Sequence, residues 1–307
     1  MLRYLGEDEH VREVGERLEP LFSFAEAIYN LWAQQGWEVN THPMPEECVQ
    51  LGSLMNTQAL RLFRSVVEQV RRCETYTATI LSRTLFETFL AVAFLVKKDI
   101  RIIVEPIRSK PGSPPATTAK YIAKIRSKGV KRTRKHLLSY QLRMLLFQAY
   151  DYFWLQKTGL NGVAKHPDMS GRVRQFKRTL DPALLQRYEQ AIGPEWTYIL
   201  KNSDNYAGLS VADRARMAGK SFSRWYEALY PSQSRAVHGI DIHHHFIVLP
   251  SDSQVASTLW PAINLMLIHI KQLQDCIGFG PDVNTALDSL LRKRIWIADN
   301  VLARLPT

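Results

Sequence analysis

The residues best suited to chemistry lie in one block, Leu229 to His245. If the chain from Ser234 to His238 is helical, these two side chains lie four residues apart on one face, with Arg235 beside them. A histidine titrates near neutral pH and can act as general base or acid, and an arginine can hold a phosphate through two hydrogen bonds. The block therefore predicts phosphodiester chemistry, with His238 and Arg235 as site residues.

Three other interpretations of this block stay open. Ser234 could act as a nucleophile with His238 as its base, although no Gly-x-Ser-x-Gly turn surrounds it and no third acid is evident. His238, Asp241 and the histidines at 243–245 could bind a metal, but neither HExxH nor Cys/His spacing is present. His238 could instead pack against polar groups of the core. We expect no metal and no other cofactor.

A second charged pair lies in a long apolar segment, residues 81–96. This segment is apolar nearly all round, which predicts a central, buried helix. Arg83 and Glu87 are four residues apart on one face and can pair, and Leu90 and Phe94 continue that face. A buried ion pair returns little net stability, because desolvation offsets the attraction. The pair either contributes to a site or orients neighbouring helices.

The net charge of +11 is concentrated in residues 106–150, which hold 11 of the 40 Lys and Arg residues and no Asp or Glu. Outside this basic segment, basic and acidic residues balance. Such a block repels itself and is typical of contact with polyanions. Nucleic acid fits better than a membrane surface, because no apolar stripe precedes Leu137; a solvated loop with incidental charge is the alternative. The residues assigned to phosphate contacts are Lys120, Lys124, Arg126, Lys128, Lys131, Arg132, Arg134 and Lys135.

Helical periodicity dominates the chain and predicts an all-α fold. The expected fold is a bundle of long central antiparallel helices that carries a basic loop and helix insertion. Two short apolar runs, 100–104 and 245–249, lack a hairpin turn signal and predict no sheet. The expected helices span residues 11–37, 58–98, 133–157, 182–201, 222–230, 257–277 and 284–305.

Breaks between these helices are marked by Gly and Pro in the runs 110–116 and 158–171. Ser210 and Asp213 have capping-box spacing and Gly219 follows, which predicts a two-turn connector helix. We expect an N-terminal helical extension over residues 1–50 and a main helical domain over 51–307 that includes the basic segment. Trp32 and Trp37 of the extension are expected to pack on the core.

Composition excludes several classes of protein. A chain of 307 residues with 46% hydrophobic residues, 15 Gly and 15 Pro is neither collagen-like nor of low complexity. Three cysteines without CxxC spacing, and no signal peptide, indicate a reducing cytoplasm. The apolar runs 89–96 and 259–270 fall short of the ~18 residues that suggest a membrane span. We expect a cytoplasmic protein without a membrane segment.

Several blocks, in this order, resemble a known family: residues 83–87, 131–140, 209–215 and 230–239, with Trp196 between the second and third. They resemble the uncharacterised bacterial helical family numbered 5677 among the domains of unknown function, over about residues 55–275. That resemblance implies no activity. More distantly, a buried helix with a polar residue and a later helix with a histidine is similar to the HEPN (higher eukaryote and prokaryote nucleotide-binding) superfamily. Its members include metal-independent ribonucleases of toxin and antiviral systems.

The HEPN-like resemblance implies that His238 is the general base on a ribose 2′-hydroxyl and that Arg235 or Arg83 stabilises charge on the phosphate. The HEPN ribonuclease motif places more residues between its arginine and histidine than the two that separate Arg235 from His238. The resemblance also implies a homodimer, because such sites commonly form between two protomers, and an antitoxin or other defence-system partner.

The expected function is metal-independent RNA cleavage, with RNA favoured over DNA. The expected catalytic residues are His238, Arg235, Arg83, Glu87 and Ser234. The alternative is a non-catalytic helical module that binds DNA, RNA or an acidic protein through the basic segment. In that case Arg83, Glu87 and His238 form an internal polar network.

Overall fold

The computed structural model describes residues 7–34, 45–107, 120–125, 137–161, 182–237 and 249–305. Within these ranges the regular structure is helical apart from one pair of short strands, so the expected all-α fold is confirmed. The chain divides into two compact units. Unit 1 comprises residues 1–44, 49–96 and 218–307, and unit 2 comprises residues 45–48 and 97–217, which include the basic segment. The extension expected over residues 1–50 stays a prediction.

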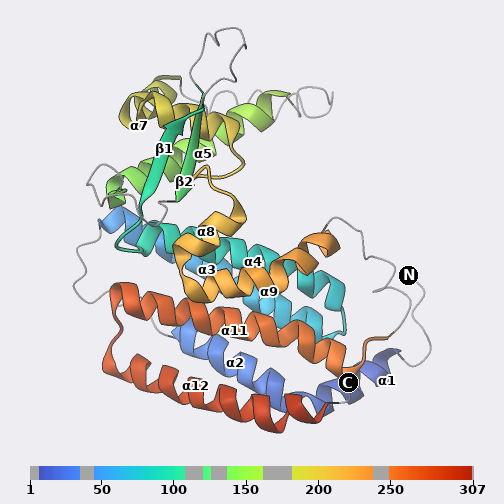
Figure 1. Ribbon diagram of the computed structural model, residues 1–307. Coiled ribbons are helices and arrows are strands. Elements are labelled where there is room, and N and C mark those ends of the chain that lie inside the picture. The colour runs from blue at the N-terminus through green and yellow to red at the C-terminus, as the bar shows by residue number, and fades with distance from the viewer. Residues whose placement is uncertain are drawn as a thin grey trace. The chain divides into compact units, whose positions relative to one another are not determined.

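Unit 1 is a bundle built around α11 (Asp252–Ile277), which packs against α4 (Thr75–Val96), α2 (Glu19–Gln34) and α9 (Lys220–Val237). α4 packs in turn against α9, and α12 (Pro281–Asn300) packs against α2. Figure 1 shows α11, α2 and α12 side by side. The unit also contains α1 (Glu7–Arg17), most of α3 (Glu46–Arg71) and the short 3-10 helix η4 (Leu302–Arg304).

α4 supplies much of the core of unit 1. Every side chain from Phe89 to Val96 is buried, as are Leu85 and Phe86. By length and composition α4 could cross a membrane, and no other helix in the described ranges could. However, 61% of its most apolar window is buried within the structure, which is typical of a core helix. The expectation of a central, buried helix at residues 81–96 is therefore confirmed.

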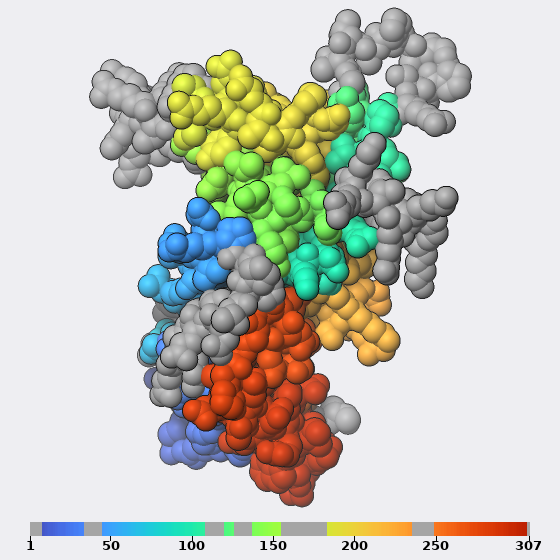
Figure 2. Space-filling view, turned by 90° about the vertical axis from the view of Figure 1, so that its left-hand side faces the viewer, coloured from blue at the N-terminus to red at the C-terminus, as the bar shows by residue number. Residues whose placement is uncertain are grey.

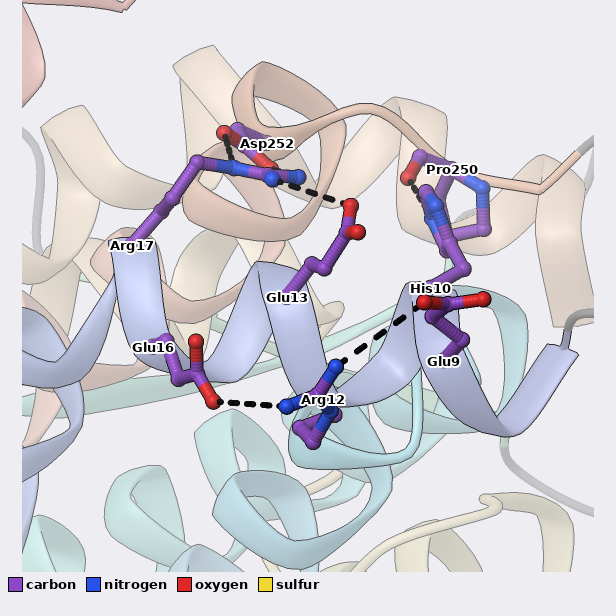
Figure 3. Close-up of polar contacts among 8 residues, drawn as sticks. All are labelled: Glu9, His10, Arg12, Glu13, Glu16, Arg17, Pro250 and Asp252. Carbon is purple, nitrogen blue, oxygen red and sulfur yellow. Dashed lines mark hydrogen bonds and ion pairs between the residues drawn. The ribbon is translucent and has the colours of Figure 1, made fainter.

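The first helix is tied to the start of α11 by polar contacts (Figure 3). Arg17 Nε and Nη2 donate to Oδ2 and Oδ1 of Asp252 at 2.7 and 3.1 Å, a two-pronged pairing. His10 Nε2 lies 3.0 Å from the carbonyl oxygen of Pro250. Figure 2 shows the surface of the N-terminal helices, in blue, against that of the C-terminal helices, in red. Trp32 is buried as expected, and Trp37 lies outside the described residues.

Unit 2 is built on α5 (Tyr140–Asn161) and α7 (Pro182–Asn202), which pack together, with the short α8 (Val211–Ala218). Its two antiparallel strands, β1 (Ile102–Pro106) and β2 (Tyr121–Ile125), pair from Ile102 with Ile125 to Pro106 with Tyr121. β2 packs against α7, where the rings of Tyr121 and Tyr198 meet edge to face at 6.1 Å. α7 is kinked at Gly193, whose φ is 81°.

The strand pair was not predicted, because a hairpin was expected to need a short turn. The run 100–104 does contribute to β1, but the partner strand lies beyond the connection 107–120. A hydrogen bond from Ile107 N–H to Lys120 O, at 2.7 Å, extends the ladder past both strand ends. Of the second run, 245–249, only Leu249 is described.

Several expected helices have different ends. The range 58–98 divides into α3 and α4 at Cys73, which has a φ of 60°. The range 11–37 likewise divides at Leu18 into α1 and α2. α5 begins at Tyr140 rather than at residue 133, because Leu137 forms a bridge with Arg101. α9 extends beyond the expected 222–230, since the helix continues past Pro231.

The expected connector helix is confirmed as α8. The Ser210 hydroxyl accepts a hydrogen bond from Asp213 N–H at 3.1 Å and donates one to the Asp213 carboxylate at 2.9 Å. Gly219 follows with a φ of 138°, a conformation that residues with a side chain rarely adopt. The N-cap serine and the terminal glycine thus define this short helix.

One cation of the basic segment is buried inside unit 2. Arg143 has no exposed surface; its Nη1 donates to Lys97 O at 2.6 Å, and its guanidinium lies 4.2 Å from the centre of the Tyr140 ring. Arg143 therefore contributes to packing and is not available to a polyanion.

The cysteine thiols show no sign of reactivity at Cys48. Burial raises the pKa of Cys48 to about 11, so its thiol is protonated at neutral pH. No disulfide joins any of the three cysteines, all of which lie in the described residues.

Unit 1 contains a buried histidine that the sequence patterns did not single out. His269 Nε2 lies 2.8 Å from Asn56 Oδ1, and the imidazole stacks on Phe89 at 3.9 Å with the edge of Trp32 nearby. Desolvation lowers the His269 pKa to about 3. The imidazole is therefore neutral at physiological pH and serves as a packed aromatic ring with one hydrogen bond.

This burial predicts a pH dependence of stability. The unfolded chain binds a proton at His269 below about pH 6.5, and the folded chain does not until about pH 3. The contribution of His269 to the free energy of unfolding, which is fully present above about pH 6.5, is thus lost as pH falls, by up to about 1.4 kcal/mol per pH unit. In urea denaturation between pH 5 and 7.5, His269→Gln should show a shallower slope of unfolding free energy against pH than the wild type. Equal slopes would contradict the assignment.

Candidate functional site

Four polar residues meet between α4 and α9, and we call them the α4/α9 cluster: Arg83, Glu87, Tyr230 and Ser234. Arg83 Nε donates to Glu87 Oε1 at 3.2 Å, and Tyr230 Oη donates to the same oxygen at 2.9 Å. Arg83 Nη1 donates to Ser234 Oγ at 3.4 Å, a longer contact. Arg83 and Ser234 are 151 positions apart in sequence, so the fold rather than local spacing brings them together.

The cluster follows from helical spacing on both helices. Arg83 and Glu87 are four residues apart on α4, and Tyr230 and Ser234 are four residues apart on α9, so each pair shares one face. Arg83 meets Ser234 and Glu87 meets Tyr230, so the two helices run antiparallel at this point. One turn of α4 therefore faces one turn of α9.

Aromatic side chains hold the α9 side of the cluster. The Arg83 guanidinium lies 4.9 Å from the centre of the Tyr230 ring, and the Tyr226 ring stacks on Tyr230 at 5.0 Å. Phe86 contacts Tyr230 at 5.8 Å and stacks on Trp225 at 4.3 Å. These contacts fix the Tyr230 ring, and with it the hydroxyl that reaches Glu87.

The cluster lies at the edge of the core rather than inside it. The side chains of Arg83 and Glu87 retain 20% and 35% of their exposure, so the ion pair is less buried than the apolar sequence around it suggested. Tyr230 is buried, and desolvation, together with the charge of Glu87, raises its pKa to about 12. The phenol is therefore protonated at neutral pH and acts as a donor to Glu87.

The other expected catalytic residues are only partly placed. Arg235 lies in the last turn of α9, and its side chain is not among those the structure describes. His238 lies outside the described residues, as do Asp241 and the histidines at 243–245. A search of the described ranges finds no group of three or more His, Cys, Asp or Glu residues that could hold a metal ion.

Of the residues assigned to phosphate contacts from the sequence, the structure describes two. Lys120 is exposed, and Lys124, on β2, is exposed and pairs with Glu105 of β1 at 3.1 Å. The other six lie outside the described residues: Arg126, Lys128, Lys131, Arg132, Arg134 and Lys135. Glu105 immediately precedes the basic segment in sequence, and on β1 it is paired with Ile122, a residue of that segment on β2. The charge of the segment is therefore partly offset at Lys124.

Sequence reasoning did not give a role to the two tyrosines of α9. Tyr226, Tyr230 and Ser234 recur every four residues, which places two aromatic rings and a hydroxyl on one face. This alignment of two aromatic residues with a polar residue is the sequence signal that could have indicated a role for the two tyrosines. The partner on α4 could not be inferred, because nothing local to either helix specifies which turns face each other.

The hydrogen bond to Glu87 predicts a modest cost for removing the Tyr230 hydroxyl. Tyr230→Phe keeps the ring and its contacts, but leaves Glu87 with one donor fewer, and should lower the unfolding free energy by about 1 kcal/mol. Tyr226→Phe is the matched control, because in the part of the chain that the structure describes no hydrogen bond is made by the Tyr226 hydroxyl. Chemical denaturation of both variants checks this expectation, and equal stabilities would argue against the Tyr230–Glu87 bond.

Comparison with known proteins gives one match. A family model, described as a family of unknown function (DUF5677), matches residues 51–254. This range contains the complete α4/α9 cluster and the basic segment, and it ends in the first turn of α11. No curated protein and no solved structure matches the chain.

Proposed function

This chain belongs to DUF5677, a family of unknown function, and from that premise we propose that it is a cytoplasmic protein that cleaves RNA without a metal. The observation that carries the proposal is the contact of Arg83 with Ser234, which is four residues before His238 in sequence. It brings an arginine from a distant helix to the block that contains Ser234, Arg235 and His238. A phosphate-binding cation and a general base are two of the groups that promote transesterification of RNA.

In the proposed reaction His238 removes the proton of a ribose 2′-hydroxyl, and the 2′-oxygen attacks the adjacent phosphorus. The bond from phosphorus to the 5′-oxygen breaks, and this oxygen takes up a proton from water or from the protonated His238, so the products are a cyclic phosphate and a 5′-hydroxyl. Arg83 and Arg235 stabilise the negative charge that develops on the phosphoryl oxygens. DNA lacks the 2′-hydroxyl, which is why RNA is the expected substrate.

The remaining members of the cluster position Arg83. Glu87 accepts from Arg83 Nε, and Tyr230 donates to the same carboxylate oxygen, which fixes the carboxylate that orients the guanidinium. Ser234 accepts from Arg83 Nη1, an arrangement that favours an orienting role over a nucleophilic one. The 20% exposure of the Arg83 side chain supports access by a phosphate.

The basic segment would supply the affinity. Arg143 is buried and Lys124 is paired with Glu105, so the proposal assigns phosphate contacts to Lys120 and to the cations at positions 126–135. Such contacts fix the position of the backbone and carry no sequence information. A homodimer, and a role in defence or as a toxin with a partner protein, follow from the HEPN-like resemblance and are part of the same proposal.

One observation favours the second candidate function, a non-catalytic helical module that binds nucleic acid or an acidic protein. Glu87 Oε1 accepts from both Arg83 and Tyr230, so the charge of Arg83 is already paired within the cluster. A paired arginine can serve the packing of α4 on α9 without any substrate. The basic segment would then be the functional part of the chain.

The two functions are separated by incubating the full chain with end-labelled single-stranded RNA, and in parallel with DNA, in EDTA. We expect the wild type to cleave RNA only, and His238→Ala to lower the rate by about 100-fold or more at an unchanged melting temperature. His10→Ala, a change on α1 away from the cluster, is the matched control. Binding without cleavage, also after addition of Mg²⁺ or Mn²⁺, would support the non-catalytic module instead.

Both functions predict that the basic segment binds polyanions. Replacing Lys131, Arg132, Arg134 and Lys135 together by Gln should weaken RNA binding and reduce the slope of log affinity against log salt by up to about 3, at ~0.7 per lost contact. A control with the same charge change replaces exposed cations elsewhere: Arg12, Arg64, Arg216 and Lys271. Salt-independent binding by the wild type would contradict both functions.

A further inference from the structure

The Arg83 guanidinium and the rings of Tyr230 and Tyr226 form a row of stacked groups. The guanidinium lies 4.9 Å from the Tyr230 ring centre, and the Tyr226 ring follows at 5.0 Å with an angle of 27° between the two planes. Tyr226 and Tyr230 are one turn apart on α9, so the row follows the helix. A cation that can hold a phosphate thus lies over one aromatic ring, and a second ring is stacked on the first.

The two rings differ in exposure. Tyr230 is buried, with 7% of its surface exposed, and its hydroxyl is bonded to Glu87. Tyr226 is half-buried, and no hydrogen bond at its hydroxyl is found among the described residues. Tyr230 is therefore a fixed support on which the ring of Tyr226 is stacked, and Tyr226 retains surface that a ligand can reach.

This arrangement fits a nucleotide rather than a generic polyanion. A nucleobase stacks on an aromatic side chain through its face, whatever its sequence, and arginine binds the phosphate that precedes or follows it. Ring placement by Tyr230 and Phe86 removes much of the ordering cost of forming such a stack. A base inside a duplex is already stacked on both faces, so only an unpaired base can use this surface.

We propose that Tyr226 is the stacking surface for an unpaired base of single-stranded RNA whose adjacent phosphate is held by Arg83. This inference rests on the proposed function and names its substrate class. Stacking on the face of a ring does not distinguish one base from another, so recognition is of single strandedness and not of sequence. Duplex RNA binds through the basic segment alone.

The test measures fluorescence anisotropy with the full-length His238→Ala protein, in which substrate is not consumed. The probes are a labelled single-stranded RNA, the same strand in a duplex, and a strand of equal length with abasic sites, which keeps the phosphates and removes the bases. Tyr226→Ala should weaken binding of the single strand by about tenfold and leave binding of the abasic strand unchanged. Tyr226→Trp, which keeps a stacking surface, should restore binding.

Tyr226→Leu provides a second variant that keeps apolar packing against Tyr230 if the alanine variant proves unstable. In that variant, quenching of a 2-aminopurine base in the single strand should be lost while overall binding through the basic segment persists. The stacking inference would be overturned if the wild type, Tyr226→Ala and Tyr226→Leu bound the single strand with equal affinity. It would also be overturned if the wild type bound the abasic strand as tightly as the single strand with bases. Either result would leave the proposed function intact. Absence of any RNA binding by the wild type would overturn both.

Discussion

The burial of α4 is the constraint on which the rest of unit 1 depends. A helix of 22 residues with this apolar composition must be covered on nearly all sides, because each square ångström of apolar surface left in water costs about 25 cal/mol. α11 covers one side and α9 another, and α2 and α12 complete the bundle around α11. Arg83 and Glu87 are tolerated on α4 because they lie where the seam with α9 opens to solvent.

The same constraint explains why the polar side chains of the α4/α9 cluster pair with one another. A guanidinium and a carboxylate at the edge of an apolar core need partners with fixed geometry, and α9 supplies a phenol and a hydroxyl at the matching spacing. The aromatic residues that fill the seam around them, Phe86 and Trp225, belong to the core. Packing and polar chemistry are therefore not separable here: the rings that bury apolar surface also hold the polar groups in place.

The sequence predicted the class of the fold well and the contacts poorly. Helical periodicity identified most helices, and the spacing of Ser210, Asp213 and Gly219 correctly predicted α8, because these signals act within one or two turns. The β1–β2 pair was missed because its pairing is set across the connection 107–120, with no local turn signal. The turns at Leu18 and Cys73 were missed because the apolar pattern continues on both sides of them.

The site was predictable in the same uneven way. The pairing of Arg83 with Glu87 follows from their spacing and is confirmed. Their contacts with Ser234 and Tyr230 depend on which turns of two distant helices face each other, and no residue pattern encodes that register. Charge counting had a similar limit: it located the basic segment, but could not separate the buried Arg143 from cations at the surface.

The family match ends at residue 254, within the first turn of α11, although α11 packs directly on α4. The shared region is therefore shorter than the part of the chain that must fold together. The bidentate contact of Arg17 with Asp252 joins a helix before the match to that same first turn. Opening of α11 would expose the apolar side of α4, so these flanking helices and the seam at Arg83 form one cooperative element. The lifetime of the candidate site is then set in part by helices that contribute no side chain to it.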